Sequence, residues 1–340
     1  MTSPDFIRQS IEKAWYGKPG LWRVLWPLAR LYQSIARRRQ SGLQRDLCHG
    51  LPVIVVGNLS VGGTGKTPVV QALVKYLQQA GWRVGLVSRG YGGSAPQYPL
   101  WVDPSTPVEH SGDEAALLVQ TTGAPMAVAP VRSEAVAMLA RQDCCDVVIS
   151  DDGLQHYAMP RVWEIAVVDG QRGFGNGYCL PLGPLREPLD RLETVDCIWV
   201  NGHKADPALP GRSFRLETQA LEPLYDAPAA SPASLPARKT PVHAIAGIGN
   251  PGRFFNTLST LGFETITHIF PDHHRYQTSD LPEEDGLPLM MTEKDAVKFR
   301  ALSLPPRGGG YWVLPVRASI QSPDFAADCK AMEQALARFR

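Results

Sequence analysis

The stretch Val55–Pro68, VVGNLSVGGTGKTP, decides the fold of this chain. An apolar run ends at Gly57, glycines follow at positions 62, 63 and 65, and Lys66 and Thr67 open a helical stretch. Such a turn between strand and helix lets backbone N–H groups surround an anion that the positive end of the helix also faces. Lys66 can then reach the β and γ phosphates of a nucleotide, and Thr67 can ligate its Mg²⁺. The predicted nucleotide loop comprises Ser60, Val61, Gly62, Gly63, Thr64, Gly65, Lys66 and Thr67.

The chain after Leu51 alternates between short β-branched runs and helical stretches. LPVIVVG precedes the loop, PVVQALVKYLQQAG follows it and WRVGLVSRG comes next, which is the order of a βαβ unit. The alternation continues with helices near Asp113 to Thr121 and Ser133 to Gln142, and with the apolar runs MAVA, DVVIS, EIAVVD and DCIWV. Such runs are typical of parallel strands buried on both faces. The sequence therefore predicts a P-loop NTPase-like α/β fold with a doubly wound, mostly parallel sheet.

A proline-rich stretch divides the chain. Seven prolines fall between Pro207 and Pro241, a composition that predicts a linker or an extended connection. Beyond it, VHAIAGI, TITHIF, LPLMMT and YWVLPV predict strands, and helices are expected from Arg253 to Leu261 and in DFAADCKAMEQALARF. We therefore predict a basic amphipathic helix at 1–45, a P-loop domain at 46–206, the connection at 207–241 and a smaller α/β domain at 242–340.

The overall composition argues against several classes of protein. The chain has 340 residues, 44% of them hydrophobic and 20% charged, as in an ordinary globular protein. Its formal net charge is +1, so no global field exists to hold a nucleic acid, and we expect no nucleic-acid partner. Six cysteines without a C-x-x-C pair indicate neither a disulfide framework nor a zinc knuckle, which favours a reducing cytoplasm. The sequence shows no signal-peptide pattern and no apolar run of about 20 residues, so we expect neither export nor a membrane span.

The first 50 residues are basic and rich in tryptophan. They contain nine Lys or Arg against three acidic residues, and three of the eight tryptophans. Apolar residues recur at helical intervals in LWRVLWPLARLYQSIARRR, namely Leu21, Leu25, Leu28, Leu31, Tyr32 and Ile35. This combination predicts a helix that lies on an anionic membrane surface. The alternative is an amphipathic helix that packs on its own domain with solvated arginines opposite.

A second motif, VVISDDGLQH, follows the pattern of a Walker B strand. The apolar run ends in Asp151 and Asp152, and a carboxylate in this position holds the Mg²⁺ that a nucleotide carries. Either aspartate could instead cap the turn before Gly153. Gln155 and His156 would return to the same site if a helical turn follows.

Five further polar clusters lie outside these two motifs. They are SRGYGG, SGDEA, LGPLREP, FPDHHRY and TEKDAVK. Each alone is a weak signal, because acids such as Asp113 and Glu114 also occur in the first turn of ordinary helices, where they offset the helix dipole. A metal site built from Asp272, His273 and His274 is disfavoured, because adjacent ligands do not easily converge on one ion.

Together, these stretches resemble one family, the tetraacyldisaccharide 4'-kinases, which are the lipid A 4'-kinases of Gram-negative bacteria. The resemblance covers essentially the whole chain. Ser60 and Val61 deviate from the general P-loop pattern but match the family's own version. The matching segments are GNLSVGGTGKTP, SRGYGG, GDEA, DDGLQH, RGFGNGYCLPLGPLREP, FPDHHRY and TEKDAVK.

The resemblance implies a lipid A biosynthesis enzyme at the cytoplasmic face of the bacterial inner membrane. It would transfer the γ-phosphoryl group of ATP to the 4'-hydroxyl of an acylated glucosamine disaccharide 1-phosphate. By the family pattern Asp113 is the base and His273, from the second domain, is its partner, with Lys66 and Arg186 also catalytic. The implied nucleotide ligands outside the loop are Gln155, His156 and Arg132, and the implied Mg²⁺ ligands are Thr67, Asp151, Asp152 and Glu187.

The chemistry of phosphoryl transfer agrees with this assignment, because it needs positioned phosphates, Mg²⁺, cations and a proton acceptor. If the base and its histidine come from different domains, domain closure would assemble the site and exclude water. The competing interpretation is a regulatory P-loop ATPase of the partition or metal-insertion type, whose G-G-x-G-K-T loop this one approaches. That class usually has a lysine where this chain has Val61. ATP turnover with and without the acylated disaccharide separates the two.

Overall fold

The computed structural model describes residues 4–225, 238–320 and 323–339. The chain forms two compact units, and neither is a continuous segment. The first unit contains Met1–Arg89, Ala124–Leu216 and Ala318–Arg340, and the second contains Gly90–Gly123 and Glu217–Arg317. Each unit is described by itself below.

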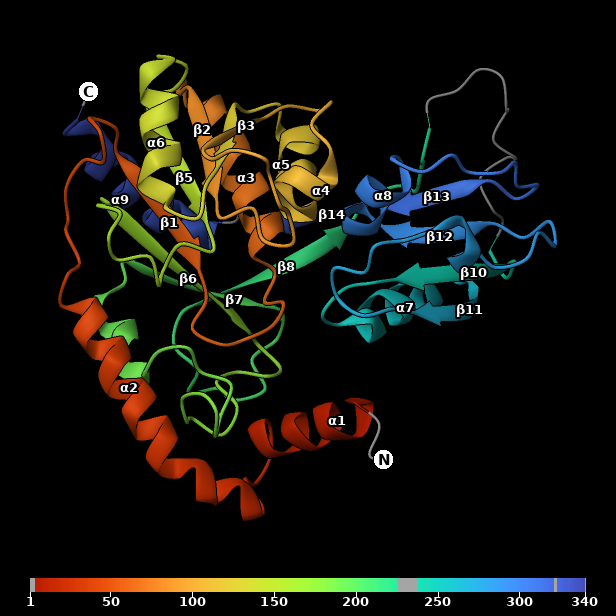
Figure 1. The fold of residues 1–340 in the computed structure, drawn as a ribbon, viewed down its shortest axis with the longest axis horizontal. Coiled ribbons are helices and arrows are strands. Elements are labelled where there is room, and N and C mark those ends of the chain that lie inside the picture. The colour runs from red at the N-terminus through yellow and green to blue at the C-terminus, as the bar shows by residue number, and fades with distance from the viewer. Residues whose placement is uncertain (1–3, 226–237, 321–322, 340) are drawn as a thin grey trace. The chain divides into compact units, whose positions relative to one another are not determined.

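The first unit is built on a large parallel sheet (Figure 1). Its strands run in the order β14-β8-β7-β6-β1-β5-β2-β4. In β1, β2 and β5 every residue is buried, as expected for strands covered on both faces. The strands are β1 (Val53–Gly57), β2 (Val84–Ser88), β4 (Met126–Val128), β5 (Val147–Asp151), β6 (Trp163–Asp169), β7 (Cys197–Asn201), β8 (Arg212–Thr218) and β14 (Val316–Ser319).

The register of this sheet aligns the ends of β1, β5 and β6. Val56 pairs with Asp151 on one side and Ile165 on the other, and all the pairings are parallel. Their carboxyl ends therefore meet at one edge, which is where ligands bind in open α/β sheets. The helices of the unit are α1 (Pro4–Trp15), α2 (Trp26–Gln40), α3 (Lys66–Gln79), α6 (Arg132–Arg141) and α9 (Pro323–Ala337), with 3₁₀ turns η1 (Gly20–Leu25) and η2 (Leu189–Thr194).

The second unit is a smaller α/β body. Its sheet has the order β11-β10-β12-β13-β9, parallel except for the short edge strand β9. The elements are β3 (Leu100–Val102), α4 (Val108–Ser111), α5 (Asp113–Thr122), β9 (Glu222–Pro223), β10 (Pro241–Ala246), α7 (Pro251–Thr260), β11 (Glu264–Ile269), η3 (Thr278–Asp280), β12 (Leu289–Thr292), α8 (Glu293–Phe299) and β13 (Tyr311–Leu314). The α/β fold class and the strands predicted from both halves of the sequence are confirmed.

The two units differ from the contiguous domains expected from the sequence. Gly90–Gly123 belongs to the second unit although it lies between two strands of the first, and the closing helix α9 belongs to the first. Helix α9 joins the first unit because Phe325 packs edge-on against Trp199 of β7, at a ring separation of 5.1 Å. Strand order along the chain therefore does not reveal which body each segment packs against.

The proline-rich stretch 207–241 is only in part the expected connection. Its segment between Pro210 and Pro223 contains no proline, and it forms β8, which pairs with β7, and the short β9. Phe214 of β8 is buried, so this part of the stretch does contribute to a core. Residues 226–237 lie outside the described part of the chain.

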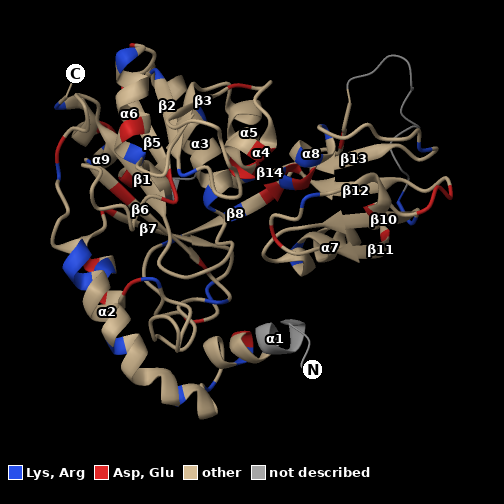
Figure 2. Cartoon of the chain, viewed as in Figure 1, with Lys and Arg blue, Asp and Glu red and all other residues tan. Residues whose placement is uncertain are grey.

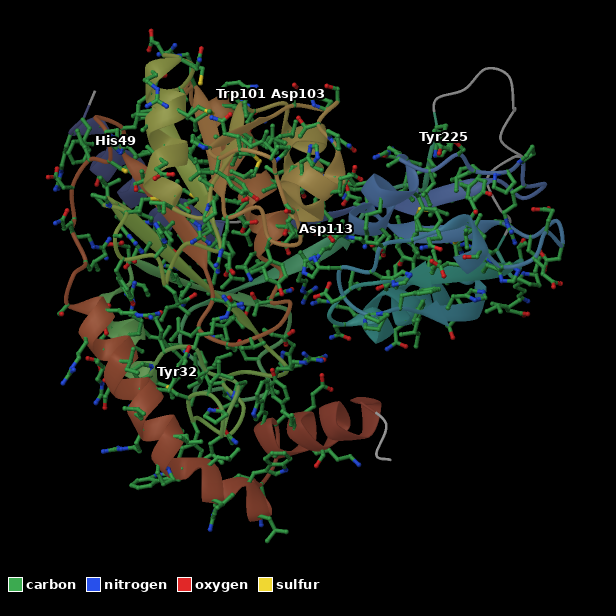
Figure 3. All side chains as sticks on the ribbon, viewed as in Figure 1. Tyr32, His49, Trp101, Asp103, Asp113 and Tyr225 are labelled. Carbon is green, nitrogen blue, oxygen red and sulfur yellow. The ribbon has the colours of Figure 1, made fainter. Side chains whose placement is uncertain are left out.

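Helix α2 presents two different faces. Ala29 is buried, and Tyr32, labelled in Figure 3, packs against the core cluster that contains Cys48 and Val53. An exposed apolar row runs from η1 into α2. Leu21, which is 96% exposed, and Val24 lie on η1, and Leu28, Leu31 and Ile35 lie on α2. Figure 2 shows basic residues along α2. The predicted stripe thus divides, with Tyr32 packed on the core, Leu25 half-buried and the rest exposed.

Neither a membrane span nor a disulfide is found in the described residues. None of their helices is both long and apolar enough to cross a bilayer. Each of the six cysteines is a free thiol, as expected from their spacing.

Candidate functional site

The glycine-rich loop between β1 and α3 has the backbone of an anion cradle. Gly65 immediately precedes α3 with a φ of 93°, and a Cβ there would meet the Asn201 side chain at 2.5 Å. Only glycine fits this conformation and this close approach. The Asn201 amide donates to the carbonyl of Thr64 at 3.0 Å, which fixes the turn from the neighbouring strand end. The N-terminal N–H groups of α3 therefore lie beside the loop, as the sequence predicted.

Two side supports hold the loop in shape. The buried Asn58 amide donates to the carbonyls of Ser60 and Gly62, and its oxygen accepts from Lys66 Nζ at 3.3 Å. The segment around Leu185 runs antiparallel to the loop, with the Val61 N–H donating to Pro184 and the Arg186 N–H donating to Leu59. This pairing brings the side chain of Arg186 to the loop.

Asp152 lies among cations at the end of β5. Its carboxylate is 3.5 Å from Lys66 Nζ and accepts from Arg186 Nη1 at 3.0 Å. Burial opposes its charge, but Lys66, Arg186 and Arg132 outweigh burial and lower the pKa of Asp152 to about 2. Its φ of 51° is left-handed, a conformation that aspartate tolerates better than most residues. Asp151 precedes it as the last residue of β5 and is buried.

Gln155 and Glu187 form the next contact outward from this group. Gln155 donates to the carbonyl of Asn58 at 3.1 Å and to Glu187 Oε2 at 2.8 Å, and it accepts from Arg186 at 3.4 Å. The other oxygen of Glu187 accepts from the Tyr157 hydroxyl, and Tyr157 in turn accepts from Arg191. Glu187 is only 2% exposed. The structure therefore brings Glu187 to Gln155, with both of its carboxylate oxygens already engaged by protein donors.

Arg132 and His156 meet on the other side of Asp152. Arg132 Nη2 donates to the carbonyl of Asp152 at 2.8 Å, and the Arg132 N–H donates to His156 Nε2 at 3.3 Å. Burial, together with the positive charges of Arg132, Arg161 and Arg89, lowers the pKa of His156 to about 4. The imidazole is therefore a neutral acceptor near pH 7. The first unit thus gathers Lys66, Asp151, Asp152, Gln155, His156, Arg132, Arg186 and Glu187 around the loop.

The second unit contains a separate polar cluster at the start of α5, where Figure 3 labels Asp113. Asp113 is 4% exposed, and His273 Nδ1 lies 3.0 and 3.1 Å from its two carboxylate oxygens. Gly112, with a φ of 83°, precedes the helix, and a Cβ there would clash with the carbonyl of Tyr91. The ring of Tyr91 packs edge-on against His273 at 4.8 Å. His273 itself has a left-handed φ of 61°.

Two lysines of α8 complete this cluster. Lys298 Nζ lies 3.7 Å from Asp113, and Lys294 Nζ lies 4.0 Å from it. Burial disfavours the ionised carboxylate, but the hydrogen bond from His273 and the two ammonium groups prevail and lower the pKa of Asp113. Asp113 is therefore ionised in the folded protein at neutral pH.

The structure corrects one expectation about this pair. Asp113 and His273 do not come from different domains, because the segment that carries Asp113 is part of the second unit. The residues next to His273 have other partners: His274 pairs with Asp280 at 3.0 Å, and Asp272 accepts from Lys294 at 3.2 Å. No cluster of three or more metal-ligating side chains is found in the part of the chain that the structure describes.

Several contributors were missed by the sequence analysis. Asn58, Tyr157 and Asn201 were given no role, and Lys294 and Lys298 were quoted only as letters of TEKDAVK. The role of Asn58 could have been predicted, because a polar residue directly after a buried strand and before a glycine loop is well placed to hydrogen-bond to that loop. Tyr157 and Asn201 carried no such signal, because their partners lie 30 and 137 residues away.

A parallel sheet with a lysine-bearing glycine loop and an aspartate pair at the neighbouring strand end defines a P-loop nucleotide-binding protein. The buried base-like carboxylate in the second unit further suggests a phosphotransferase. The chain belongs to the family described as tetraacyldisaccharide-1-P 4'-kinase, whose model matches residues 21–334.

Individual relatives agree over nearly their full length. A tetraacyldisaccharide 4'-kinase of Alkalilimnicola ehrlichii is 48% identical over 89% of this chain and 91% of its own. The protein of the same name from Pseudomonas fluorescens is 45% identical over 93% of each chain. A crystal structure of LpxK from Aquifex aeolicus in complex with ATP superposes with a TM-score of 0.71, covering 93% of this chain and 98% of that one at 24% identity. This structural likeness shows the fold.

Proposed function

We propose that this kinase transfers the γ-phosphoryl group of ATP to the 4'-hydroxyl of an acylated glucosamine disaccharide 1-phosphate, a step of lipid A biosynthesis. The observation that carries the proposal is the presence of both halves of the required chemistry. The first unit has a glycine loop with Lys66 and Arg186 beside it. The second has an ionised carboxylate held by a histidine. A regulatory ATPase needs the first but has no organic acceptor to deprotonate.

The residues of the loop suit a magnesium nucleotide. The buried hydroxyl of Thr64 has no hydrogen-bond partner among the described residues, and Gly62 and Gly65 hold left-handed backbone that exposes N–H groups to an anion. Thr67, Asp151 and Asp152 are the residues that would hold Mg²⁺, which when bound would neutralise phosphate charge. Glu187 we assign instead to orienting Gln155, because it accepts from Gln155 and Tyr157 and contacts the loop through Gln155.

Lys66 and Arg186 supply fixed positive charge for the transferred group. Both ammonium and guanidinium are held by Asp152, so neither has to reorganise when phosphate arrives. His156 and Arg132 lie on the other side of Asp152 and would contact the nucleotide from there. This arrangement uses positioning and electrostatics, which is what phosphoryl transfer demands of a protein.

Asp113 is the proposed proton acceptor. As the sugar oxygen forms its bond to the γ-phosphorus and ADP departs, the hydroxyl proton moves to the Asp113 carboxylate. A general base must be ionised at working pH. His273 and the α8 lysines outweigh the opposing effect of burial and lower the pKa of Asp113, which meets that requirement.

The function is tested by ATP turnover with and without the acylated disaccharide 1-phosphate. We expect ADP release to depend on the acceptor and to match phosphorylated product one to one. Equal ADP release in its absence would support the regulatory ATPase instead. Phosphate transfer to the disaccharide lacking acyl chains would show that the sugar alone is the substrate.

We also propose that the enzyme binds peripherally at the cytoplasmic face of the inner membrane through the exposed apolar row of η1 and α2. Five exposed apolar side chains on these two consecutive elements, next to Arg23, Arg30 and Arg37–Arg39, match a surface that enters an anionic lipid interface. A lipid acceptor would explain why such a row remains uncovered. The inward face with Ala29 and Tyr32 keeps the helix attached to its unit.

Membrane binding is tested with the double variant Leu28→Gln and Leu31→Gln. Because both side chains are more than half exposed, folding should be unaffected, whereas sedimentation with phosphatidylglycerol vesicles should be lost. The matched control is Ile266→Gln, which removes an exposed isoleucine from β11 and should leave vesicle binding unchanged. Undiminished sedimentation of the double variant would reject the α2 surface.

A further inference from the structure

Lys294 of α8 contacts three acceptors with one ammonium group. Its Nζ lies 3.2 Å from Glu114 Oε1, 3.2 Å from Asp272 Oδ1 and 3.5 Å from His273 Nε2. An ammonium has three N–H donors and cannot accept a hydrogen bond. Burial disfavours its charge, but Glu114, Asp113 and Asp272 prevail and raise the pKa of Lys294. The lysine is therefore charged, and each of its donors has one partner.

These contacts assign the protons of His273. Asp113 is ionised and can only accept, so the ring nitrogen 3.0 Å from it, Nδ1, carries a hydrogen. The opposite nitrogen, Nε2, faces an ammonium that can only donate, so Nε2 presents its lone pair. The neutral form of His273 therefore directs its single N–H at Asp113.

The charge of Lys294 opposes protonation of the ring, although the groups around His273 together raise its pKa. An imidazolium would direct an Nε2–H at Lys294, which is both a donor facing a donor and a repulsion between like charges. Asp272 Oδ2 lies 3.7 Å from Nε2 and would favour the charged ring, but the other oxygen of Asp272 binds Lys294. Glu114 also binds Lys294, Lys298 faces Asp113, and Tyr91 contacts the ring by its edge.

We propose that Lys294 is a positioning residue for the transfer reaction, which opposes protonation of His273 at Nε2 and keeps its Nδ1–H directed at Asp113. The inference rests on the proposed function of Asp113 as the base. A neutral ring orients the carboxylate without adding a third full positive charge beside it, and such a charge would weaken the carboxylate as a proton acceptor.

The direction of the effect follows from the contributions to the imidazole. The hydrogen bond to Asp113 and the charges of Asp113 and Asp272 prevail and raise the pKa of His273, whereas burial and the charge of Lys294 oppose this rise. Removing the ammonium therefore leaves the upward contribution less opposed. The ring should then take up its second proton at a higher pH than in the wild-type protein.

The test is nitrogen NMR of the full chain labelled with [¹⁵N]histidine, with no nucleotide or lipid present. The chain has eight histidines, and the variant His273→Gln identifies the signals of His273 by their loss. On the alkaline side of the wild-type titration of His273, we expect Nδ1 protonated and Nε2 bare. In Lys294→Met the titration of His273 should move to higher pH.

Two further variants control for charge and for folding. Lys298→Met removes the ammonium one turn along α8, which touches Asp113 and not the imidazole, and it should leave the Nε2 lone pair in place. Lys294→Arg keeps the positive charge and should restore the wild-type titration. Glu114 and Asp272 are each about a third exposed, so Lys294→Met leaves them access to water and a foldable protein.

Kinetics give a second readout that a purely structural role would not produce. In Lys294→Met, kcat/KM for the lipid acceptor should fall about 10-fold at pH 7, part of the roughly 10²- to 10⁴-fold that a general base supplies. Its acidic limb should move to higher pH in parallel with the NMR titration. A loss that is equal at every pH would overturn the proposal, as would an unshifted titration or a neutral wild-type ring that carries its proton at Nε2. The NMR experiment needs no turnover, so it tests the role of Lys294 independently of the proposed function. An unshifted titration would reject the role of Lys294 even if Asp113→Ala strongly reduces transfer, and an Asp113→Ala enzyme of wild-type activity would reject the proposed base even if the titration shifts.

Discussion

The clusters around Asp152 and Asp113 both stabilise an ionised carboxylate, but they are built from different parts of the chain. Each has a carboxylate of lowered pKa among at least two cationic side chains. Each also includes a residue with left-handed backbone, Asp152 in one case and His273 in the other. Such conformations are costly and persist where the surroundings enforce them, often at functional sites. The two clusters differ in which elements of the fold supply their residues.

The Asp152 cluster is built at the ends of adjacent parallel strands. Its loop follows β1, the aspartates end β5, and much of the anion cradle is backbone that two glycines and a helix terminus define. The Asp113 cluster is made of side chains alone, from α5, the loop after β11, and α8. Its key contacts span 160 residues between Asp113 and His273 and 180 between Glu114 and Lys294. The glycine loop is therefore encoded by neighbouring residues, although Asp152 and Asn201 reach it from other strand ends, whereas the key contacts of the base site depend on tertiary packing.

The sharpest way to separate the clusters is a double-mutant cycle at Asp113 and His273. Asp113→Ala should lower kcat by about 10²- to 10⁴-fold and leave ATP affinity nearly unchanged, because a general base contributes that much and does not bind nucleotide. Since the two residues act as a unit, adding His273→Ala should cost little more than the worse single change.

The measurement is kcat/KM with the lipid acceptor for both single variants and the double. Fully additive losses would mean that Asp113 and His273 act independently. An Asp113→Ala enzyme defective mainly in ATP affinity would move Asp113 to the nucleotide site and remove the contrast between the two clusters.

Lys66→Ala should disturb the other cluster with a somewhat smaller effect. Loss of one positioned cation from the transferred phosphate typically costs about 10²- to 10³-fold in rate. Unlike Asp113→Ala, this change should also weaken ATP binding, which equilibrium titration with a nucleotide analogue would measure. Lys75→Ala, at an exposed lysine of the same helix, is the matched control and should behave as wild type. A Lys66→Ala enzyme with near wild-type kcat would contradict the loop assignment.

Acid stability should expose the charge balance at Asp152. Its folded-state pKa of about 2 is below its unfolded value, so ionisation stabilises the fold above the unfolded pKa and the stabilisation is lost as pH falls from about 4 toward 2. The shift corresponds to about 2 kcal/mol. Asp152→Asn, which tolerates the same left-handed backbone, should remove this part of the pH dependence.

Urea unfolding at a series of pH values between 6 and about 3 would measure the slope. Asp143→Asn provides the control, because that carboxylate is 90% exposed and should not alter the slope. If Asp152→Asn and wild type lose stability in parallel, the cations around Asp152 do not hold its ionised form as described.

The sequence alone predicted the glycine loop and the aspartate pair of the first unit, because each motif is formed by neighbouring residues. A glycine loop between a strand and a helix, and an aspartate pair at a strand end, need only neighbouring residues and the register of a parallel sheet. The α/β class followed from the same periodicity, since strands buried on both faces are nearly continuous apolar runs. The six free cysteines likewise agreed with their spacing.

Tertiary structure alone decided how the remaining polar clusters are used. It placed Gly90–Gly123 in the second unit, where Tyr91 and Asp113 meet His273. It engaged Glu187 with Gln155 and Tyr157, and it turned Tyr32 inward on α2 while leaving Leu28 and Leu31 exposed. Periodicity reports which residues share a face of one helix or strand, but burial and ion pairing are set by whatever packs against that face. For contacts between residues more than a hundred positions apart, the packing partner depends on the burial and desolvation free energies of the whole fold. A local sequence pattern does not contain that information.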